Sequence, residues 1–185
     1  MSTVESPAVG GVAAALRRLY FVRFAFAIVW AVLLFTTKSE LGPLGVTLVV
    51  LYPLFDVAAA VVDLRSSQGV RSVRGLYVNI AISLIATIGL AIASTSGVPA
   101  VLRVWGAWAI VAGLVQLIVA LGRRLMGGQW PMILSGGLSV LAGASFVAGA
   151  SAEDPKLTNI AGYAVLGGIF FLVSAIRLGR AAKGN

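Results

Sequence analysis

The apolar residues of this chain fall into long runs that short polar turns separate. The clearest two runs are residues 130–150, which hold 21 residues without a charge, and residues 157–176, which hold another 20. A polar turn at residues 152–156 lies between them. At about 1.5 Å rise per residue, roughly 20 apolar residues cover the ~30 Å hydrocarbon core of a bilayer. This pattern predicts a transmembrane helical hairpin.

Two more hairpins with the same plan precede this one. Pro43, Pro99 and Pro155 are evenly spaced along the sequence and lie in turns between apolar runs, and Tyr52, Trp108 and Tyr163 recur at almost the same period. A regular period of this kind indicates an internal repeat. We therefore predict an all-α membrane protein of six transmembrane helices, built as three hairpins around a pseudo-threefold axis or in a sequential ring. The expected helices are 19–37, 44–64, 76–94, 100–122, 130–150 and 157–176.

Small residues spaced four apart predict where helices approach closely. Ala109 and Gly113 correspond, one repeat later, to Ala164 and Gly168. The fifth helix carries a stripe of Ser135, Ser139 and Gly143. Small side chains let the backbones of two membrane helices come close together. We expect the fifth and sixth helices to pack most closely, through this stripe.

Composition supports the membrane class and one domain. Of the 185 residues, 59% are hydrophobic and 11% charged, and the mean hydropathy is +1.02. Such values are typical of membrane proteins. We expect the six-helix domain to cover residues 17–180, a disordered tail at 1–16 and a short tail at 181–185.

The cations gather at helix ends on one predicted side. Ten of the 14 are Arg17, Arg18, Arg65, Arg71, Arg74, Arg123, Arg124, Arg177, Arg180 and Lys183, against Lys38 and Lys156 in the opposite turns. The other two, Arg23 and Arg103, lie just inside helix ends, and we expect Arg103 to reach the outer membrane interface with its charged group. The positive-inside rule then places both termini in the cytoplasm. It also explains the net charge of +8 without nucleic acid, which we do not expect as a partner. We expect Arg65, Arg71 and Arg74 to attract anionic lipid head groups.

Cysteine and histidine are absent from the sequence. Disulfides, thiol chemistry, zinc sites of the usual type and histidine-based acid–base catalysis are therefore excluded. We expect neither a metal site nor a cofactor.

Asp56 breaks the repeat, because it stands where the other two copies have Ala112 and Gly167. It lies about nine residues, or roughly 13 Å, from the predicted cytoplasmic end of its helix. A charged residue at a helix centre costs about 2.5–3.5 kcal/mol on insertion scales. Asp56 should therefore face the interior and be protonated or paired. Its expected partners are Asn79, Gln116 or a backbone carbonyl that Pro53 frees from helical hydrogen bonding.

Other polar and aromatic residues have simpler expected roles. Arg23 and Asp63 lie at similar depths near the cytoplasmic surface and are expected to form an ion pair, whereas Arg23 would have to stretch to reach Asp56. Gln116 is expected to link helices. The following aromatic residues suit the two membrane interfaces: Tyr20, Tyr52, Tyr77, Trp108, Trp130 and Tyr163.

The chain also resembles a known family. The three-hairpin plan, the proline in each outer turn, Trp108–Gly113 and the segment from Trp130 to Gly143 are similar to the HdeD-like family of small bacterial inner-membrane proteins. The resemblance implies a six-helix plasma-membrane protein linked to acid resistance and the stress response. It supplies no catalytic residues.

These observations leave three functional classes open. The favoured one is a non-catalytic membrane protein that acts on envelope properties, lipids or membrane partners. The first alternative is an intramembrane enzyme that uses Asp56 as a general acid on an apolar lipid or isoprenoid, as a cyclase or isomerase. The second is a small proton-linked transporter, with Asp56, Gln116, Asn79 and Arg23 as its intramembrane polar residues. The sequence does not indicate an oligomeric state.

Overall fold

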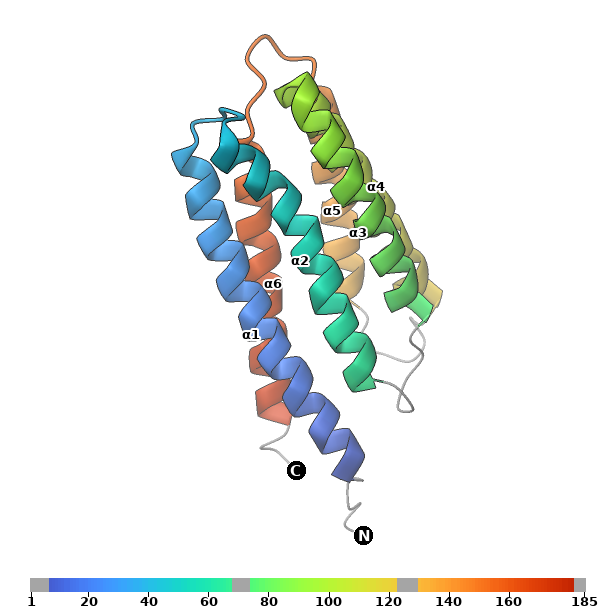
Figure 1. Cartoon of the computed structure of the whole chain (residues 1–185). Helices are drawn as coiled ribbons and strands as arrows, with labels where there is room; N and C mark the ends of the chain where they lie inside the picture. The colour runs from blue at the N-terminus through green and yellow to red at the C-terminus, as the bar shows by residue number, and fades with distance from the viewer. Residues whose placement is uncertain (1–6, 68–73, 123–129, 182–185) are drawn as a thin grey trace.

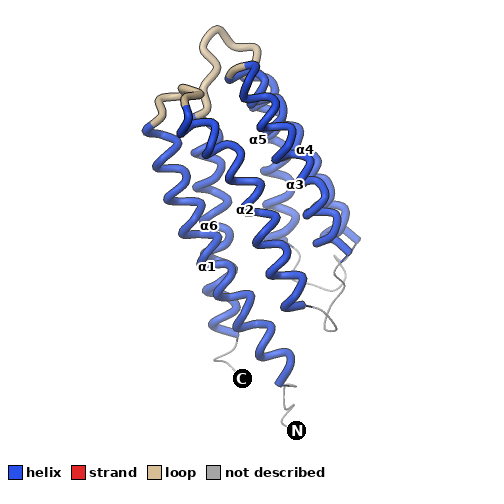
Figure 2. Tube along the Cα trace, in the orientation of Figure 1, coloured by secondary structure: helices blue, strands red, loops and turns tan. Residues whose placement is uncertain are grey.

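Six α-helices make up almost all of the chain that the structure, a computed structural model, describes: residues 7–67, 74–122 and 130–181. The elements are α1 Pro7–Thr36, α2 Pro43–Ser67, α3 Arg74–Ala93, the short 3-10 helix η1 Ser94–Ser96, α4 Val98–Gly122, α5 Trp130–Gly149 and α6 Thr158–Ala181 (Figures 1 and 2). All six α-helices are long and apolar enough to cross a membrane. The predicted all-α membrane fold is confirmed.

The first helix begins at Pro7, well before its predicted start at residue 19. Proline suits the first position of a helix, and the alanine-rich segment that follows favours helical backbone. Leu16 and Leu19 are buried and pack with Ala59 of α2. The prediction of a disordered tail is therefore wrong for residues 7–16. The rest of that tail, residues 1–6, and residues 182–185 lie outside the described residues.

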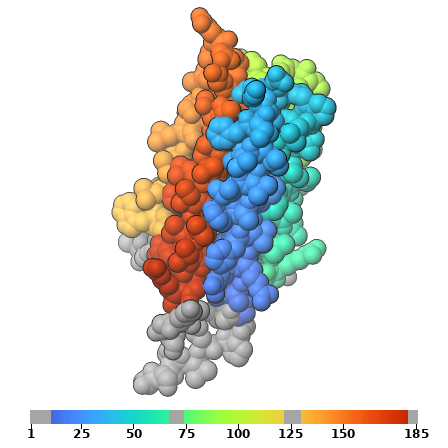
Figure 3. Space-filling model, turned by 90° about the vertical axis from the view of Figure 1, so that its left-hand side faces the viewer, coloured from blue at the N-terminus to red at the C-terminus, as the bar shows by residue number. Residues whose placement is uncertain are grey.

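The helices follow one another around a closed ring. Each helix contacts its neighbours in the chain, and α6 closes the ring by packing along α1 (Figures 1 and 3). The most extensive contacts lie between successive hairpins, where α2 meets α3, α4 meets α5 and α6 meets α1. Contacts within a hairpin are smaller, and α5 with α6 has the smallest of all neighbouring pairs. The prediction that α5 and α6 pack most closely is wrong.

Glycines on both helices explain why α5 packs against α4 instead. A Cβ atom added at Gly113 would lie 2.7 Å from the carbonyl oxygen of Gly136, and one at Gly143 would lie 2.6 Å from that of Gly106. Larger residues at these places would force the two backbones apart. The stripe of small residues on α5 was correctly predicted to pack closely against another helix. That helix is α4 and not α6, because α4 has small residues at matching heights.

The small residues of α6 face α1. Ala164 is buried, and a Cβ atom added at Gly168 would lie 3.2 Å from the Cβ atom of Ala27. The turns also join here, since the backbone N–H of Leu157 donates a hydrogen bond of 3.0 Å to the Ser39 hydroxyl. The first and third hairpins are thus fixed to each other along the helices and at the turns.

The two ends of the bundle differ in charge and in packing. The start of α1 and the end of α6 lie at the same end of the bundle, which we call the arginine end (Figure 1). The described arginines near the helix ends belong to this end: Arg17, Arg18, Arg65, Arg74, Arg177 and Arg180. The opposite end, with the turns after α1, α3 and α5, is the turn end. Buried side chains including Trp30, Leu34, Leu90 and Trp105 fill the interior toward the turn end.

Pro53 is accommodated inside a continuous α2. Proline removes one backbone donor and leaves the carbonyl four residues earlier, that of Val49, without its helical partner. The indole N–H of Trp30 donates a 2.7 Å hydrogen bond to the adjacent carbonyl of Leu48. A side chain of α1 therefore supplies a polar contact at the weak point of α2.

The outer surface is apolar along the middle of the helices. Val29, Ile85, Ile118 and Leu141 are 60–70% exposed. Large aliphatic side chains on several helices would be costly to expose to water over so wide an area. This surface fits the hydrocarbon core of a bilayer.

Candidate functional site

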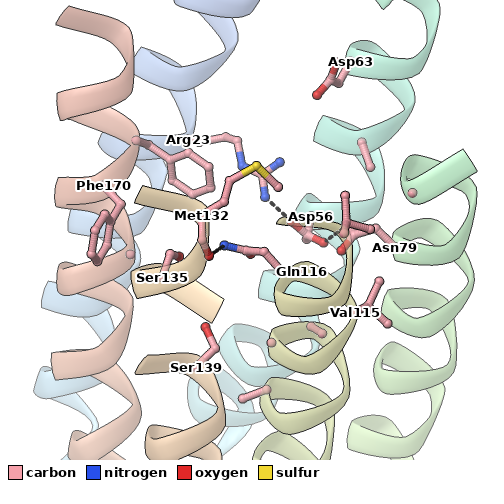
Figure 4. Close-up of a pocket in the computed structure, with 18 of the residues that line it drawn as sticks. Arg23, Asp56, Asp63, Asn79, Val115, Gln116, Met132, Ser135, Ser139 and Phe170 are labelled. Carbon is pink, nitrogen blue, oxygen red and sulfur yellow. Dashed lines mark hydrogen bonds and ion pairs between the residues drawn. The ribbon is translucent and has the colours of Figure 1, made fainter. Parts of the chain in front are cut away.

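A cavity of about 630 Å³ lies inside the ring, in the half of the bundle toward the arginine end (Figure 4). All six helices contribute to its wall. It extends from Asp63 and Arg74, near the ends of α2 and α3, to the level of Tyr52, Trp108 and Tyr163. Cavities of this size hold small organic ligands in other proteins.

Arg23 of α1 and Asp56 of α2 form an ion pair in the wall of the cavity (Figure 4). The Nη2 atom of Arg23 donates to Oδ1 of Asp56. The predicted pairing was with Asp63, because Arg23 and Asp63 lie at similar depths. Arginine has a long flexible stem, and it reaches the deeper carboxylate.

Two residues of α3 hold the second oxygen of Asp56. The side-chain amide of Asn79 donates to Oδ2 at 2.7 Å, and the hydroxyl of Ser83 donates to it at 2.9 Å. Asp56 is only 8% exposed. Its carboxylate therefore joins α1, α2 and α3 in one buried polar cluster, and the expected contact with Asn79 is confirmed.

Asp63 lies two turns closer to the arginine end on the same face of α2. It is 7% exposed and lines the cavity. Arg74 lines the same region from the start of α3. The cavity wall thus contains two arginines and two aspartates among the described residues, and their formal charges cancel.

Gln116 does not contact Asp56 through a hydrogen bond. Its amide donates to the carbonyl oxygen of Met132 at 2.9 Å, which links α4 to α5. The expectation that Gln116 serves as a link between helices is supported. Of the alternative partners named for Asp56, Asn79 is the one observed, and Gln116 is not, since Arg23, Asn79 and Ser83 occupy the carboxylate. Gln116 nevertheless lines the same cavity (Figure 4).

An aromatic layer closes the cavity toward the turn end. Tyr52 and Trp108 have ring centroids 6.3 Å apart, and Tyr52 also contacts Trp30 and Trp105. Tyr163 completes the layer from α6. The prediction that Tyr52, Trp108 and Tyr163 form interface belts is wrong, because they face the interior. Tyr77 and Trp130, in contrast, are 55% and 71% exposed.

Hydroxyl groups of the odd-numbered helices fix two of these rings. The indole N–H of Trp108 donates to the Ser83 hydroxyl at 3.3 Å, and the hydroxyls of Ser139 and Tyr163 lie 2.8 Å apart. Ser139 follows Ser83 by one sequence period, and Tyr163 follows Trp108 by almost the same spacing. The same contact thus occurs in the second and third hairpins.

Other residues that line the cavity also recur at this sequence period, at several depths along the helices. Each of the following sets lines the cavity from three helices and recurs at the spacing of the turn prolines or one position short of it: Tyr52, Trp108 and Tyr163; Asp56, Ala112 and Gly167; Ala60, Gln116 and Phe171; Arg23, Asn79 and Ser135. At the level of Asp56, two of the three positions are small. A Cβ atom added at Gly167 would meet nothing within 4 Å. The space in the wall therefore exists because Ala112 and Gly167 leave it open.

Arg23 is also held from its other side. Its Cζ atom lies 4.3 Å from the centroid of the Phe171 ring, in the geometry of a cation–π contact. Neither Phe171 nor Ser83 was selected from the sequence as a partner in this cluster. Ser83 follows Asn79 by one helical turn and so lies on the same face of α3. This spacing in the sequence could have identified Ser83 as a second partner of Asp56. The contact with Phe171 depends on how α6 closes the ring, which the sequence did not reveal.

The remaining predicted residues lie outside this cluster. Arg65 is exposed at the arginine end, Arg71 lies outside the described residues, and Arg103 is exposed on α4 toward the turn end. Ser135 lines the cavity from α5.

Comparison with protein-family models, with curated proteins and with solved structures found no match.

Proposed function

We propose that this chain is a non-catalytic protein of the bacterial plasma membrane that binds an apolar or amphipathic molecule in its central cavity. The observation that carries the proposal is the cavity itself, which six apolar helices surround and a fixed ion pair borders. A protein with a purely structural role would be expected to fill this space with side chains. The resemblance to the HdeD-like family, with its link to acid resistance and stress, is consistent with such a role in the membrane.

The hydrogen bonds of Asp56 favour binding over catalysis. A general acid must hold a proton that it can deliver to the substrate. Asp56 instead accepts hydrogen bonds from Arg23, Asn79 and Ser83, so donors from the protein engage both of its oxygens. The enzyme alternative, in which Asp56 protonates a lipid, therefore has less support than a role for Asp56 in holding Arg23.

The transporter alternative also has limited support. Transporters with internal repeats often break their helices at equivalent positions around the substrate. Here α2 continues through Pro53, and α4 and α6 are continuous as well. The cavity would have to open toward the turn end, where the aromatic layer lies.

The membrane orientation is part of the proposal. The described arginines at one end support cytoplasmic termini under the positive-inside rule. The cavity would then extend to the cytoplasmic surface. Arg65 and Arg74 at that surface would attract anionic lipid head groups.

Two glycines of α6 provide a matched test of the cavity. Gly167 lines it, whereas Gly162 is exposed on the outer face, and a Cβ atom at either would meet nothing within 4 Å. The full chain and the variants Gly167→Phe and Gly162→Phe would be purified in lipid nanodiscs. Mass spectrometry of the extracts would compare the small molecules that copurify with each.

We expect the unchanged chain and Gly162→Phe to retain a molecule that Gly167→Phe has lost. Equal extracts from all three, with all three folded, would contradict binding in the cavity.

A further inference from the structure

Most of the N–H groups of Arg23 make no hydrogen bond to the described part of the protein. The guanidinium carries five N–H groups, and its one hydrogen bond among the described residues runs from Nη2 to Asp56. Its side chain is 17% exposed, and none of its nitrogens is a buried atom without a partner. Since Arg23 lines the cavity, the N–H groups without a protein partner are open to it (Figure 4).

Asp56 fixes this arrangement and is itself occupied. One of its oxygens accepts from Arg23, and the other accepts from Asn79 and Ser83. The carboxylate is therefore poorly placed to bind a cationic ligand. With Phe171 against the other side of the guanidinium, the remaining donors of Arg23 keep a fixed direction before any ligand arrives.

The ligand chemistry follows from these donors and from the local charge. Arginine donors match the two oxygens of a carboxylate or a phosphate. The described residues of the cavity wall carry two positive and two negative formal charges, on Arg23, Arg74, Asp56 and Asp63, so the cavity favours an anion with as little charge as possible. A singly charged carboxylate fits this condition better than a doubly charged phosphate.

A second donor lies at the equivalent position of the third hairpin. Ser135 holds the place in that hairpin that Arg23 holds in the first, lines the same cavity and makes no hydrogen bond within the described part of the chain. The wall between these polar groups and the aromatic layer is apolar, with Ala112, Gly167 and Phe170 among its members. The site thus combines donors for one anionic group with an apolar space for the rest of the molecule.

We propose that the cavity binds a monocarboxylate with an apolar body, its carboxylate on the free N–H groups of Arg23 and within reach of Ser135. This inference rests on the proposed function and specifies its ligand class. The apolar body lies against Tyr52, Trp108 and Tyr163. Either a fatty acid or an aryl-substituted acid has this chemistry.

Binding can be measured with 11-dansylaminoundecanoate and with its methyl ester, on the full chain in nanodiscs of phosphatidylcholine. Energy transfer from tryptophan to the dansyl group reports occupancy, because Trp108 lines the cavity. The Gly167→Phe variant in identical nanodiscs gives the signal from lipid partition alone. We expect cavity-dependent binding of the acid to be roughly ten- to hundredfold tighter than that of the ester, the usual contribution of a charged hydrogen bond.

Competitors identify the head group and the body. Decanoate and 4-phenylbutyrate should displace the probe, and their relative strengths distinguish a chain from an aromatic body. Decyltrimethylammonium should not compete, and decyl phosphate should compete less well than decanoate. A phosphate or ammonium preference would overturn the proposal.

Two arginine variants test the role of Arg23. Arg23→Lys keeps a cation beside Asp56 but loses the planar fork, so it should weaken the acid roughly tenfold or more and leave the ester within about twofold. Arg103→Lys, on the exposed face of α4, is the matched control and should change neither.

Comparing the acid with the ester distinguishes failure of the carboxylate proposal from failure of the proposed function. Equal cavity-dependent binding of acid and ester would overturn the carboxylate preference and leave the proposed function standing. If neither probe gives a signal that Gly167→Phe removes, both proposals are wrong.

Discussion

Asp56 and Arg23 form a buried ion pair in which each charge compensates the other. Removing one partner of a buried ion pair leaves an unpaired charge, which typically costs roughly 3–5 kcal/mol, whereas replacing both partners is often tolerated. Arg23 is only 17% exposed on its side chain, so water compensates little for the loss. The pair also links α1, α2 and, through Asn79 and Ser83, α3. Stability and the fixed direction of Arg23 should thus depend on the same contact.

We predict that Asp56→Asn and Arg23→Gln each lower the thermal midpoint in detergent, by about 6–20 °C if 1 kcal/mol corresponds to about 2–4 °C. The double variant Arg23→Gln with Asp56→Asn should recover part of the loss, because two amides can hydrogen-bond without a charge. Circular dichroism on heating measures the midpoints. If the double variant loses as much stability as the two single variants together, or more, the residues do not act as a pair.

At the scale of the helices, the contacts between hairpins matter more than those within them. Glycine backbones meet across α4 and α5, and Gly168 of α6 meets Ala27 of α1. The sequence indicated which positions are small but not which helix faces them, because the spacing of small residues defines a face and not a partner. Arg23 was likewise assigned to Asp63 from depth alone, since a one-dimensional pattern does not give the position around the ring.

We predict that Gly143→Leu disrupts the contact of α4 with α5. The added side chain would meet the Gly106 carbonyl oxygen, 2.6 Å from its Cβ atom. Gly137→Leu on the same helix is the control, because its Cβ atom would meet nothing within 4 Å. Thermal aggregation in detergent should begin at a clearly lower temperature for Gly143→Leu only. Equal stability of the two variants would mean that α5 does not present this face to α4.

We further predict that cysteines at positions 27 and 168 form a disulfide. The Ala27→Cys and Gly168→Cys changes would put two Cβ atoms about where a disulfide requires them, since the Cβ–Cβ separation there is 3.2 Å before adjustment. The native sequence has no cysteine that would interfere. Ala27→Cys with Gly162→Cys, about 9 Å farther along α6, should stay reduced. Cross-linking of the second pair but not the first would show that α6 does not close on α1 as described.

At the scale of the whole molecule, the sequence predicted what depends on local pattern. Runs of apolar residues identified six helices, and Pro43, Pro99 and Pro155 marked the turns between them. The start of α1 at Pro7 was missed because small residues outside the membrane pattern were read as a tail. The cavity was not predicted at all, because a space in the interior depends on which helices place Ala112 and Gly167 on its wall.

The whole-molecule orientation gives a separate prediction. Reporter fusions after Gly42, Gly97 and Ser151, in the three turns at the turn end, should be active on the outer side of the membrane, because the arginines favour the cytoplasm. Alkaline phosphatase and green fluorescent protein fusions would measure this in cells. Cytoplasmic activity at any one of the three sites would break the hairpin scheme.

The most direct measurement is an experimental structure of the full chain crystallised from a lipid mesophase, at a resolution that shows side chains. We predict a six-helix ring with Arg23 paired to Asp56, open space beside Ala112 and Gly167, and non-protein density in that space. An interior filled by side chains, or Arg23 turned away from Asp56 toward the membrane surface, would contradict the account.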